Sequence, residues 1–531
     1  MWAVTLIAVA VVLWLLYRKK WFSSLKEQGI PGPEPNLLFG NLFDLIRKGP
    51  LVCKGEWIKK YGNVVGYYFG ATPVVIVADA DLLKRILVSD FHKFINRPNL
   101  SSPVHRVNKS ALTKREEGYS QRLVFLRDKR WKEIRSIITP TFTASKMKQM
   151  APIMNGAIDS LLDNIEKQGS SEFNIHGMYQ RLTMDVIGRT AFGIQTDVQN
   201  NPDDLFLRCA KGFFQNDTKN PILLLSSSFQ SLNFLWTAVG WLKVRATNKG
   251  TNPVNELIQS VKDVIASRRS NKESRRNDLL QLMIDAEIDD LSTITSDDLT
   301  AKDDNEEKTT GASSGKLTRR MTDADILDNS VMFFLVGYET TSTALAFTTH
   351  FLIHYPEAQE KLRQEVQNLI ETEGDLDYSS VNKLQYLDEV IHESLRLFPP
   401  IYQFHREVAE DVELGKYKLK KGCKVEVSAN HMHRNPELWG SDADEFKPER
   451  FSPENKKNIH PMAYQSFGAG PRNCVGMRFA YMEAKLALAR LLAKYRLVTS
   501  SKTESLDGIT LKIAPTILTP RNGIWLKAVP V

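Results

Sequence analysis

Residues 467–476 read Phe-Gly-Ala-Gly-Pro-Arg-Asn-Cys-Val-Gly, and no other stretch of the chain is as informative. The loop carries Cys474 near its end, just before a helix-period run of apolar residues that begins at Met477. The positive end of that helix and its unpaired backbone N–H groups would stabilise a thiolate at this position. The pattern therefore predicts a cysteine that is used as an anion.

The residues around this cysteine suit a large planar partner. Gly468 and Gly470 let the backbone turn tightly and approach such a group closely. Phe467 can shield one side of the sulfur, and Arg472 offers a planar cation for a carboxylate. A ligand to heme iron must be an anionic, partly dry sulfur whose hydrogen bonds tune its electron donation. The residues around Cys474 provide these properties.

These ten residues resemble the heme-binding signature of the cytochrome P450 superfamily, Phe-x-x-Gly-x-Arg-x-Cys-x-Gly, and fill every fixed position. The alternative for Cys474 is a buried cysteine that acts as a small hydrophobe. The resemblance is to the microsomal drug- and steroid-oxidising group of animals, more distantly to thromboxane synthase, and covers the chain from about Ile30 onward. It implies a mostly α fold with a small β region and heme b held by the Cys474 thiolate.

The composition is that of a large globular protein, with 531 residues of which 25% are charged and 42% hydrophobic. The four cysteines are scattered without paired spacing, which argues against a disulfide framework or a zinc site. The net charge is +8, but the basic residues are spread without a nucleic-acid-binding signature. We expect an anionic membrane surface or an acidic protein as partner, and no nucleic acid.

The N-terminus predicts a membrane anchor over residues 1–20. Met1 to Tyr17 contains no charged residue, and Arg18-Lys19-Lys20 follows at once. Seventeen helical residues span roughly 25 Å, the low end for crossing a bilayer. A cleaved secretory signal is the alternative, but the segment lacks a basic start and a small-residue exit. The positive-inside rule then leaves the rest of the chain in the cytosol.

A basic, proline-rich linker is predicted over residues 21–35, because Ile30-Pro31-Gly32-Pro33-Glu34-Pro35 cannot continue a helix. One catalytic domain is expected over residues 36–531. Microsomal members of the family carry a similar anchor and hinge. The resemblance therefore implies a single-pass protein of the endoplasmic reticulum membrane with a cytosolic catalytic domain.

Helical periodicity dominates the region after the linker. Short strands are expected near Val64–Phe69 and Val74–Val77. The expected helices include Leu123–Ile138, Met147–Ile165, Met178–Ala191, Val254–Ser267 and Tyr355–Ile370.

Two segments depart from this periodicity. Asp289 to Arg320 is polar and nearly devoid of large apolar residues, so we predict a mobile surface insertion, with a regulatory docking segment as the alternative. Ile222 to Val244 is apolar and aromatic but interrupted by serines. A buried core segment and a surface that dips into the membrane are equal alternatives for it.

A long helix is expected from the capping pattern at Thr322 to about His354, before Pro356. Gly337 lies in its middle, where a glycine costs about 1 kcal/mol relative to alanine. The neighbouring acid and hydroxyl suggest that this glycine makes room for O2 and water.

The sequence around Gly337, Val-Gly-Tyr-Glu-Thr-Thr, resembles the oxygen-activation motif of the family. The resemblance implies that Thr340 donates a hydrogen bond to bound oxygen and that Glu339 relays protons from solvent. The alternative for Thr340 is a helical threonine that bonds back to the preceding turn.

Two further groups of residues match elements of the family. Glu393 and Arg396 lie three apart on one helix face, where a salt bridge is possible. With Arg450, in Pro448-Glu449-Arg450-Phe451, they match the family's Glu-x-x-Arg and Pro-Glu-Arg-Phe elements. The resemblance implies a buried network that holds the cysteine loop.

The two heme propionates need cations. Trp131 and Arg135 lie one helical turn apart, so the indole N–H and the guanidinium can reach one carboxylate. The pair matches the family's Trp-x-x-x-Arg, and the resemblance adds Arg97 and Arg406; Arg472 completes the set. The alternative for these residues is ordinary surface charge.

The resemblance implies monooxygenation: one atom of O2 enters an apolar small molecule (xenobiotic, steroid or lipid). Electrons come from NADPH-cytochrome P450 reductase, with cytochrome b5 as an optional partner. The chain lacks a dinucleotide signature, since Gly468-x-Gly470 has Asn473 in place of the third glycine. One alternative is a heme-thiolate isomerase of lipid peroxides like thromboxane synthase; the other is a non-catalytic heme-binding protein.

Overall fold

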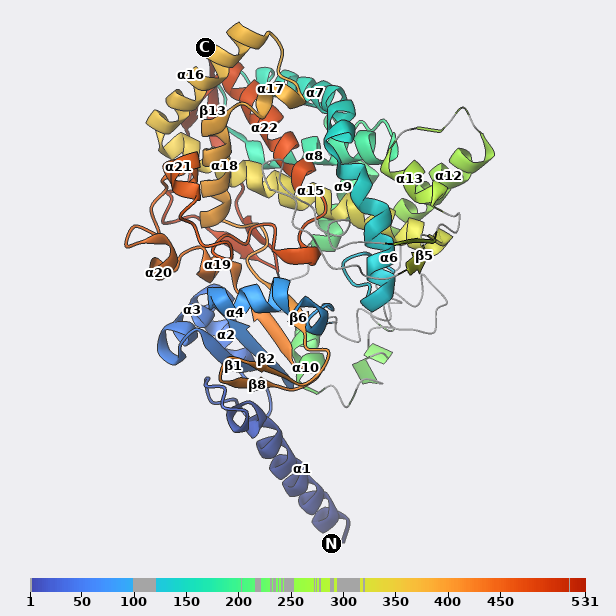
Figure 1. Cartoon of the computed structure of the whole chain (residues 1–531), viewed down its shortest axis with the longest axis vertical. Helices are drawn as coiled ribbons and strands as arrows, with labels where there is room; N and C mark the ends of the chain where they lie inside the picture. The colour runs from blue at the N-terminus through green and yellow to red at the C-terminus, as the bar shows by residue number, and fades with distance from the viewer. Residues whose placement is uncertain are drawn as a thin grey trace. The chain divides into compact units, whose positions relative to one another are not determined.

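The computed structural model describes residues 2–98, 121–201, 203–214, 221–229, 232, 235–236, 238–239, 242, 253–271, 273, 275–276, 278–286, 291–293, 316–318, 320–514 and 516–531. The described chain is mostly helical with small β-sheets, which confirms the predicted fold class (Figure 1). It forms two compact units. The smaller comprises Met1–Ser120, Asp217–Gly250 and Gln403–Met432, and the larger comprises Gln121–Asn216, Thr251–Tyr402 and His433–Val531.

The smaller unit contains a four-stranded sheet in the order β1-β2-β9-β6. Its two central strands, Thr72–Val77 and Lys424–Val427, are rich in valine, and most of their side chains are buried. The strands of this unit are β1 Val64–Phe69, β2 Thr72–Val77, β6 Phe404–Glu407, β9 Lys424–Val427, and the separate pair β7 Val412–Leu414 and β8 Tyr417–Leu419. Its helices are α1 Trp2–Glu27, α2 Leu42–Lys48, α3 Pro50–Tyr61, α4 Ala80–Lys84, η1 Arg85–Ser89, η2 Phe91–Lys93, α10 Pro221–Ser228 and α19 Ala429–Met432.

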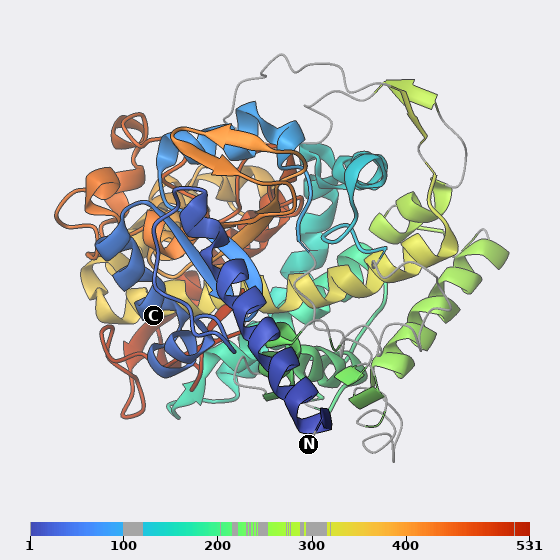
Figure 2. The ribbon, with the colours of Figure 1, turned by 90° about the horizontal axis from the view of Figure 1, so that it is seen from below.

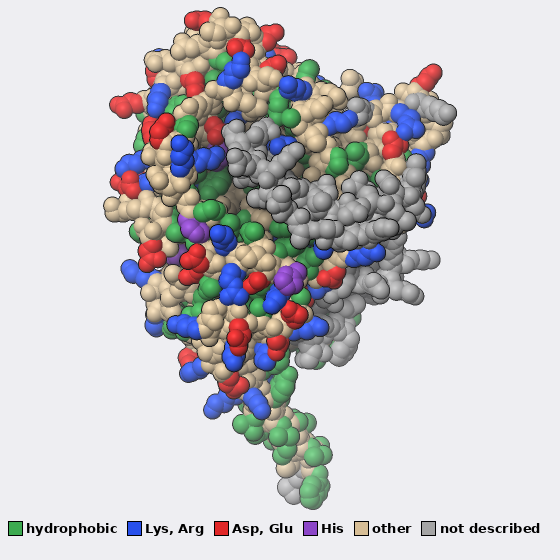
Figure 3. Space-filling view, viewed as in Figure 1, with side chains coloured by type: hydrophobic (Ala, Val, Ile, Leu, Met, Phe, Trp, Pro, Cys, Tyr) green, Lys and Arg blue, Asp and Glu red, His purple; other side chains and the backbone are tan. Residues whose placement is uncertain are grey.

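Helix α1 is long and apolar enough to cross a membrane. The N-terminal part of α1 carries exposed hydrophobic side chains, which Figure 3 shows in green. The helix does not end at Lys20 but continues to Glu27, so the first seven residues of the predicted linker are helical. Arg18 is buried and donates to the carbonyl oxygens of Leu38 (2.7 Å) and Ser228 (3.2 Å), which ties α1 to its own unit.

The larger unit holds most of the helices. They are α6 Asp128–Ile138, η3 Thr139–Phe142, α7 Ala144–Glu166, α8 Ile175–Phe192, α9 Leu205–Phe214, α12 Pro253–Ser270, α13 Leu279–Asp285, α15 Asp323–His354, α16 Pro356–Glu373, α17 Tyr378–Val381, α18 Gln385–Leu397, α20 Pro436–Trp439, η6 Pro448–Phe451, α21 Pro453–Lys456, η7 Gly470–Arg472 and α22 Met477–Lys494. Its strands are β3 Phe173–Asn174, β4 Leu291–Thr293, β5 Lys316–Thr318, β10 Tyr495–Thr499, β11 Leu511–Ile513, β12 Leu518–Pro520 and β13 Trp525–Pro530.

Helix α15 is the long yellow helix of Figures 1 and 2, and most of its residues are buried. It begins at the predicted capping pattern: Thr322 and Asp325 form a reciprocal capping box. It ends at His354, directly before Pro356 begins α16. The sequence therefore predicted both ends of this helix correctly.

Helix α6 begins five residues later than predicted, at Asp128 instead of Leu123. The backbone N–H of Leu123 donates to Oδ1 of Asn329 on α15 at 2.7 Å. This tertiary bond holds the segment before α6 in turns, and local periodicity could not reveal it.

The structure describes parts of the two segments that lack clear helical periodicity. Most of residues 289–320 lies outside the described residues; the described pieces pair as the antiparallel strands β4 and β5. In the 222–244 segment, Ser226 and Ser228 are buried, whereas Leu225, Leu235 and Leu242 are between 37% and 58% exposed. Leu225, Leu235 and Leu242 therefore lie on the surface.

Candidate heme-thiolate site

The cysteine loop is closed by a backbone hydrogen bond: the N–H of Cys474 donates to the carbonyl oxygen of Phe467 at 2.8 Å. Gly468 and Gly470 have φ of +70° and +68°, a conformation that side-chain-bearing residues rarely adopt. The glycines are therefore required by the turn itself. The loop continues through η7 and leads into α22.

Cys474 differs from the other three cysteines, all of which the structure describes. None of the four forms a disulfide, and only Cys474 is exposed. Burial raises the pKa of Cys53 to about 11 and that of Cys209 and Cys423 to about 12. These three thiols stay protonated at neutral pH, so only Cys474 is placed to act as an accessible ligand.

Trp131, Arg135 and Arg472 come together beside this loop. The Arg472 guanidinium lies over the Trp131 ring, 4.5 Å from its centroid, and its Nη2 donates to the carbonyl oxygen of Leu126. Nη2 of Arg135 donates to Oδ1 of Asn473 at 2.9 Å. Residues of α6 and of the cysteine loop thus form one cationic group.

Arg97 and Arg406 belong to the smaller unit. Arg406 is 1% exposed, and its Nε has no hydrogen-bond acceptor among the described residues. Burial and the neighbouring charge of Arg97 hold the pKa of the Arg406 guanidinium well below its usual value. An anion would stabilise the buried Arg406 guanidinium beside the charge of Arg97, and a heme propionate would supply one.

Helix α15, which is mostly buried, carries a row of partly exposed residues in its central part. Met332, Val336, Thr340 and Ala344 are four residues apart, so they lie along one face of the helix. Oγ1 of Thr340 donates to the carbonyl oxygen of Val336 at 2.8 Å. This is the bond to the preceding helical turn that was the alternative to a role in oxygen activation. The bond engages the hydroxyl hydrogen and leaves lone pairs of the oxygen on the half-exposed face.

Gly337 serves helix packing. A Cβ at this position would lie 3.3 Å from two carbon atoms of Ile187 on α8. The role expected for Gly337, room for O2 and water, stays a prediction. Its lack of a side chain lets α15 approach α8.

Glu339 also faces α8. Its side chain is buried and accepts a hydrogen bond from Nε2 of Gln180 at 3.2 Å. Burial raises the pKa of this carboxyl group, against the opposing influences of Lys512 and Gln180. Glu339 therefore holds a proton more tightly than an exposed glutamate does.

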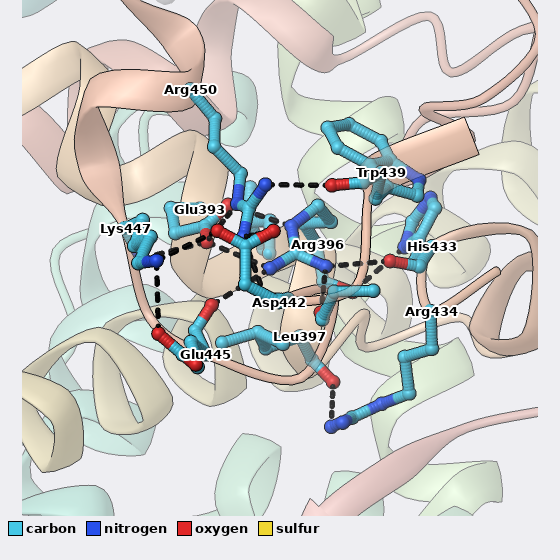
Figure 4. A network of polar contacts seen from close by, with 12 residues as sticks. Glu393, Arg396, Leu397, His433, Arg434, Trp439, Asp442, Glu445, Lys447 and Arg450 are labelled. Carbon is cyan, nitrogen blue, oxygen red and sulfur yellow. Dashed lines mark hydrogen bonds and ion pairs between the residues drawn. The ribbon is translucent and has the colours of Figure 1, made fainter. Parts of the chain in front are cut away.

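Glu393, Arg396 and Arg450 form one buried network, which Figure 4 shows. The Arg396 side chain is fully buried and binds both carboxylate oxygens of Glu393 at 2.7 Å. Nε of Arg450 lies 3.4 Å from Oε1 of the same carboxylate. The predicted grouping is observed.

His433 connects this network to the cysteine loop. Nη1 of Arg396 donates to the His433 carbonyl oxygen at 2.6 Å, and the backbone N–H of Gln465 donates to Nε2 of His433 at 2.6 Å. Oγ of Ser466 donates to the carbonyl oxygen of Leu395 at 3.0 Å. Sequence reasoning missed His433, because no local motif relates it to partners more than thirty residues away.

Phe142 is a second residue that the sequence did not single out. Its ring centroid lies 6.3 Å from that of Phe333 on α15 and 6.3 Å from that of Phe479 on α22. A Cβ added at Gly476 would lie 3.9 Å from the Phe142 ring. This side chain therefore packs between the long helix and the segment that follows the cysteine.

These features fit a heme bound through a thiolate: one exposed cysteine on a glycine turn, buried cations for carboxylates, and an open helix face. The sequence profile of the family described as Cytochrome P450 matches residues 30–527. The chain belongs to the cytochrome P450 family. It is an oxidoreductase, a P450 monooxygenase whose cofactor is heme with an axial cysteine thiolate.

Individual relatives agree with the family. The chain is 34% identical to human Cytochrome P450 3A5 over 98% of this chain and 95% of the relative. It is 33% identical to bovine Cytochrome P450 3A28, over 99% and 95%. It is 32% identical to Thromboxane-A synthase of Macaca fascicularis, over 99% and 97%. The prediction of a P450 similar to this group is confirmed.

Proposed function

We propose that the protein is a membrane-bound monooxygenase that inserts one atom of O2 into an apolar small molecule (a xenobiotic, steroid or lipid). NADPH-cytochrome P450 reductase supplies the electrons, with cytochrome b5 as an optional second donor. The observation that carries the proposal is Cys474: it is the exposed cysteine, on a turn that requires two positive-φ glycines.

Cys474 supplies the axial thiolate, and Phe467 shields the sulfur. Trp131, Arg135 and Arg472 bind a propionate on the side of α6. Arg97 and Arg406 of the smaller unit are assigned to propionate binding as well. When bound, the heme activates O2 and carries out the oxygen insertion.

Glu339 and Thr340 of α15 are assigned to proton delivery. Burial raises the pKa of Glu339, so its carboxyl group holds a proton more tightly than that of an exposed glutamate. Thr340 presents its hydroxyl oxygen on the half-exposed face and donates to Val336 in the resting state. Rotation about χ1 of Thr340 would redirect its hydrogen toward a ligand on that face. A positioned donor of this kind accelerates a proton-dependent step.

The Glu393–Arg396–Arg450 network supports the cysteine loop and takes no part in the chemistry. It acts through His433, whose imidazole accepts from the backbone just before the loop. A buried network with this many satisfied donors is rigid. Its function is to keep the thiolate at one distance from the heme.

Residues 1–20 act as a single-pass anchor in the endoplasmic reticulum membrane, residues 21–35 as the connection, and residues 36–531 as the cytosolic catalytic domain. The exposed leucines of the 222–244 segment add a second membrane contact. Phe229 of that segment stacks on Trp14 of α1, with the ring centroids 6.4 Å apart, so the two apolar surfaces are continuous.

A peroxide isomerase is the second candidate, favoured by the similarity to Thromboxane-A synthase. The Glu339–Thr340 pair favours the monooxygenase, since an isomerase needs no proton delivery to O2.

One experiment separates the two. The holoenzyme is reconstituted with the reductase, and product from a lipid extract is measured by mass spectrometry with and without NADPH. Product that requires NADPH and carries ¹⁸O from ¹⁸O2 supports the monooxygenase. An isomer of an added lipid peroxide that forms without NADPH and keeps both peroxide oxygens would establish the isomerase instead.

A further inference from the structure

A hydrogen-bonded tyrosine and histidine lie behind the cysteine loop. Tyr481, on α22, has its ring centroid 4.9 Å from that of Phe467, the residue whose carbonyl oxygen binds the Cys474 N–H. The Tyr481 hydroxyl oxygen lies 2.9 Å from Nε2 of His392 on α18. Both side chains are buried. None of the roles assigned above uses this pair.

The direction of the Tyr481–His392 bond follows from the other ring nitrogen. Nδ1 of His392 lies 2.8 Å from the backbone carbonyl oxygen of Asp388, which can only accept a hydrogen bond. Nδ1 must therefore carry the hydrogen, and in the neutral imidazole Nε2 is left as an acceptor. The phenol O–H of Tyr481 thus donates to a base that is already in place.

The surroundings of His392 favour a transferred proton. A carboxylate oxygen of Asp388 lies 3.3 Å from Nδ1 of His392, and Nζ of Lys485 lies 2.8 Å from Asp388. Burial opposes the charge of the Asp388 carboxylate, but the attraction of the Asp388 carboxylate to an imidazolium at His392 and to the Lys485 ammonium lowers the pKa of this carboxyl group. The imidazole therefore has an anion beside it that would stabilise an imidazolium.

From this arrangement we propose that Tyr481 is a one-electron donor that rescues the heme when it has been oxidised without a substrate to attack. The inference rests on the proposed heme-thiolate function. The oxidant is a hydroperoxide, whose O–O bond takes two electrons from the heme centre. Tyr481 returns one electron to the heme, and its phenolic proton moves to Nε2 of His392. The products are a neutral tyrosyl radical and an imidazolium beside Asp388.

Tyr464 continues the path away from the loop. Its hydroxyl oxygen lies 3.4 Å from that of Tyr481, and its side chain is half-buried. A radical shared between the two phenols is reduced near the surface by one electron from a thiolate, and the proton held by His392 returns to the phenol oxygen. A second cycle returns the other electron to the heme, two thiyl radicals combine as a disulfide, and solvent protons convert the remaining oxygen to water. The oxidation is thereby removed from the thiolate of Cys474.

The test uses the full-length holoenzyme, first characterised by its reduced carbon-monoxide spectrum and then mixed with cumene hydroperoxide and frozen. The expected result is a tyrosyl electron paramagnetic resonance signal that is lost in Tyr481→Phe. Tyr179→Phe is the matched control. It removes a buried phenol that is bound to Thr349 at 2.8 Å, and it should leave the signal intact.

A second variant tests the role of the base. His392→Gln introduces an amide side chain that can still accept a hydrogen bond but cannot take up a proton near neutral pH, so the signal should be lost or its g-values shifted. Bleaching of the Soret band by the hydroperoxide should become faster in both Tyr481→Phe and His392→Gln than in wild type.

The experiment distinguishes failure of the Tyr481 inference from failure of the heme-thiolate function. A normal carbon-monoxide spectrum with a radical signal that survives Tyr481→Phe would overturn this inference alone, and so would wild-type protein that gives no signal. Absence of the heme-thiolate spectrum in wild type would overturn the proposed function and this inference with it.

Discussion

The backbone N–H of Cys474 is bound to the carbonyl oxygen of Phe467 at 2.8 Å. This single bond ties the residue that carries the sulfur to the residue that can shield it. The two positive-φ glycines between them permit the turn, so the geometry of the thiolate depends on the backbone of a short loop.

Replacing Cys474 with alanine should abolish the red-shifted Soret band of the reduced carbon-monoxide complex, since that band requires a thiolate opposite the gas. Cys423→Ala is the matched control. It removes a buried thiol whose pKa is raised to about 12, and it should leave the band intact. If the band persisted in Cys474→Ala, another residue would be the ligand.

Replacing Thr340 with alanine should leave heme content and the carbon-monoxide spectrum unchanged but divert NADPH-derived electrons into hydrogen peroxide. A positioned proton donor is typically worth about 10²–10⁴-fold in rate, and water can replace part of this. Product and peroxide per NADPH are measured with a turned-over substrate. Thr340→Ser, which keeps the hydroxyl, should restore most of the coupling. Equal ratios for wild type and Thr340→Ala would reduce this residue to a structural role.

Replacing Arg396 with methionine should destabilise the protein by about 3–5 kcal/mol, because it leaves the Glu393 carboxylate buried without its main partner. Thermal unfolding of the heme-bound protein is the measurement. Lys494→Met, which breaks the exposed pair with Glu166, should change the midpoint little. A similar midpoint shift in both variants would contradict the distinction between the two ion pairs.

Acid should weaken the smaller unit through Glu426. Burial alone would raise the pKa of this carboxyl group, but Lys54 and His405 bring it to about 2. The lowered pKa means that the stabilisation is fully present above about pH 4.5 and is lost as the pH falls toward 2. Thermal midpoints of wild type and Glu426→Gln should therefore converge over this range. A difference that stayed constant from pH 7 to pH 3 would show that the charge of Glu426 is not responsible.

Two truncations test how α1 is held. Deleting residues 2–16 removes much of the apolar span but keeps Arg18, whereas deleting residues 2–20 also removes the donors to Leu38 and Ser228. Both should move protein from the membrane pellet toward the supernatant with the heme spectrum intact. Only the longer deletion should increase proteolysis near residues 37–38. Exposed leucines of the 222–244 segment should leave some protein in the pellet, and Leu225→Ser with Leu235→Ser should reduce that fraction.

Much of this protein could be predicted from local sequence. The cysteine loop, both ends of α15 and the charge-free start of α1 are encoded by residues that are neighbours in the chain, where turns, caps and helical periods are local physics. The pairing of Glu393 with Arg396 belongs to the same class, because the two lie one turn apart.

Other features depend on contacts between distant residues. The start of α6 is displaced by a bond from Leu123 to Asn329, and Gly337 packs against Ile187 of α8. The Tyr481–His392 bond joins α22 and α18, and no local sequence motif relates the two residues. Hydrogen bonds and packing act across a few ångströms of space, whatever the separation along the chain. The chain's residue types therefore fix the chemistry that is available, and folding decides which of those groups meet.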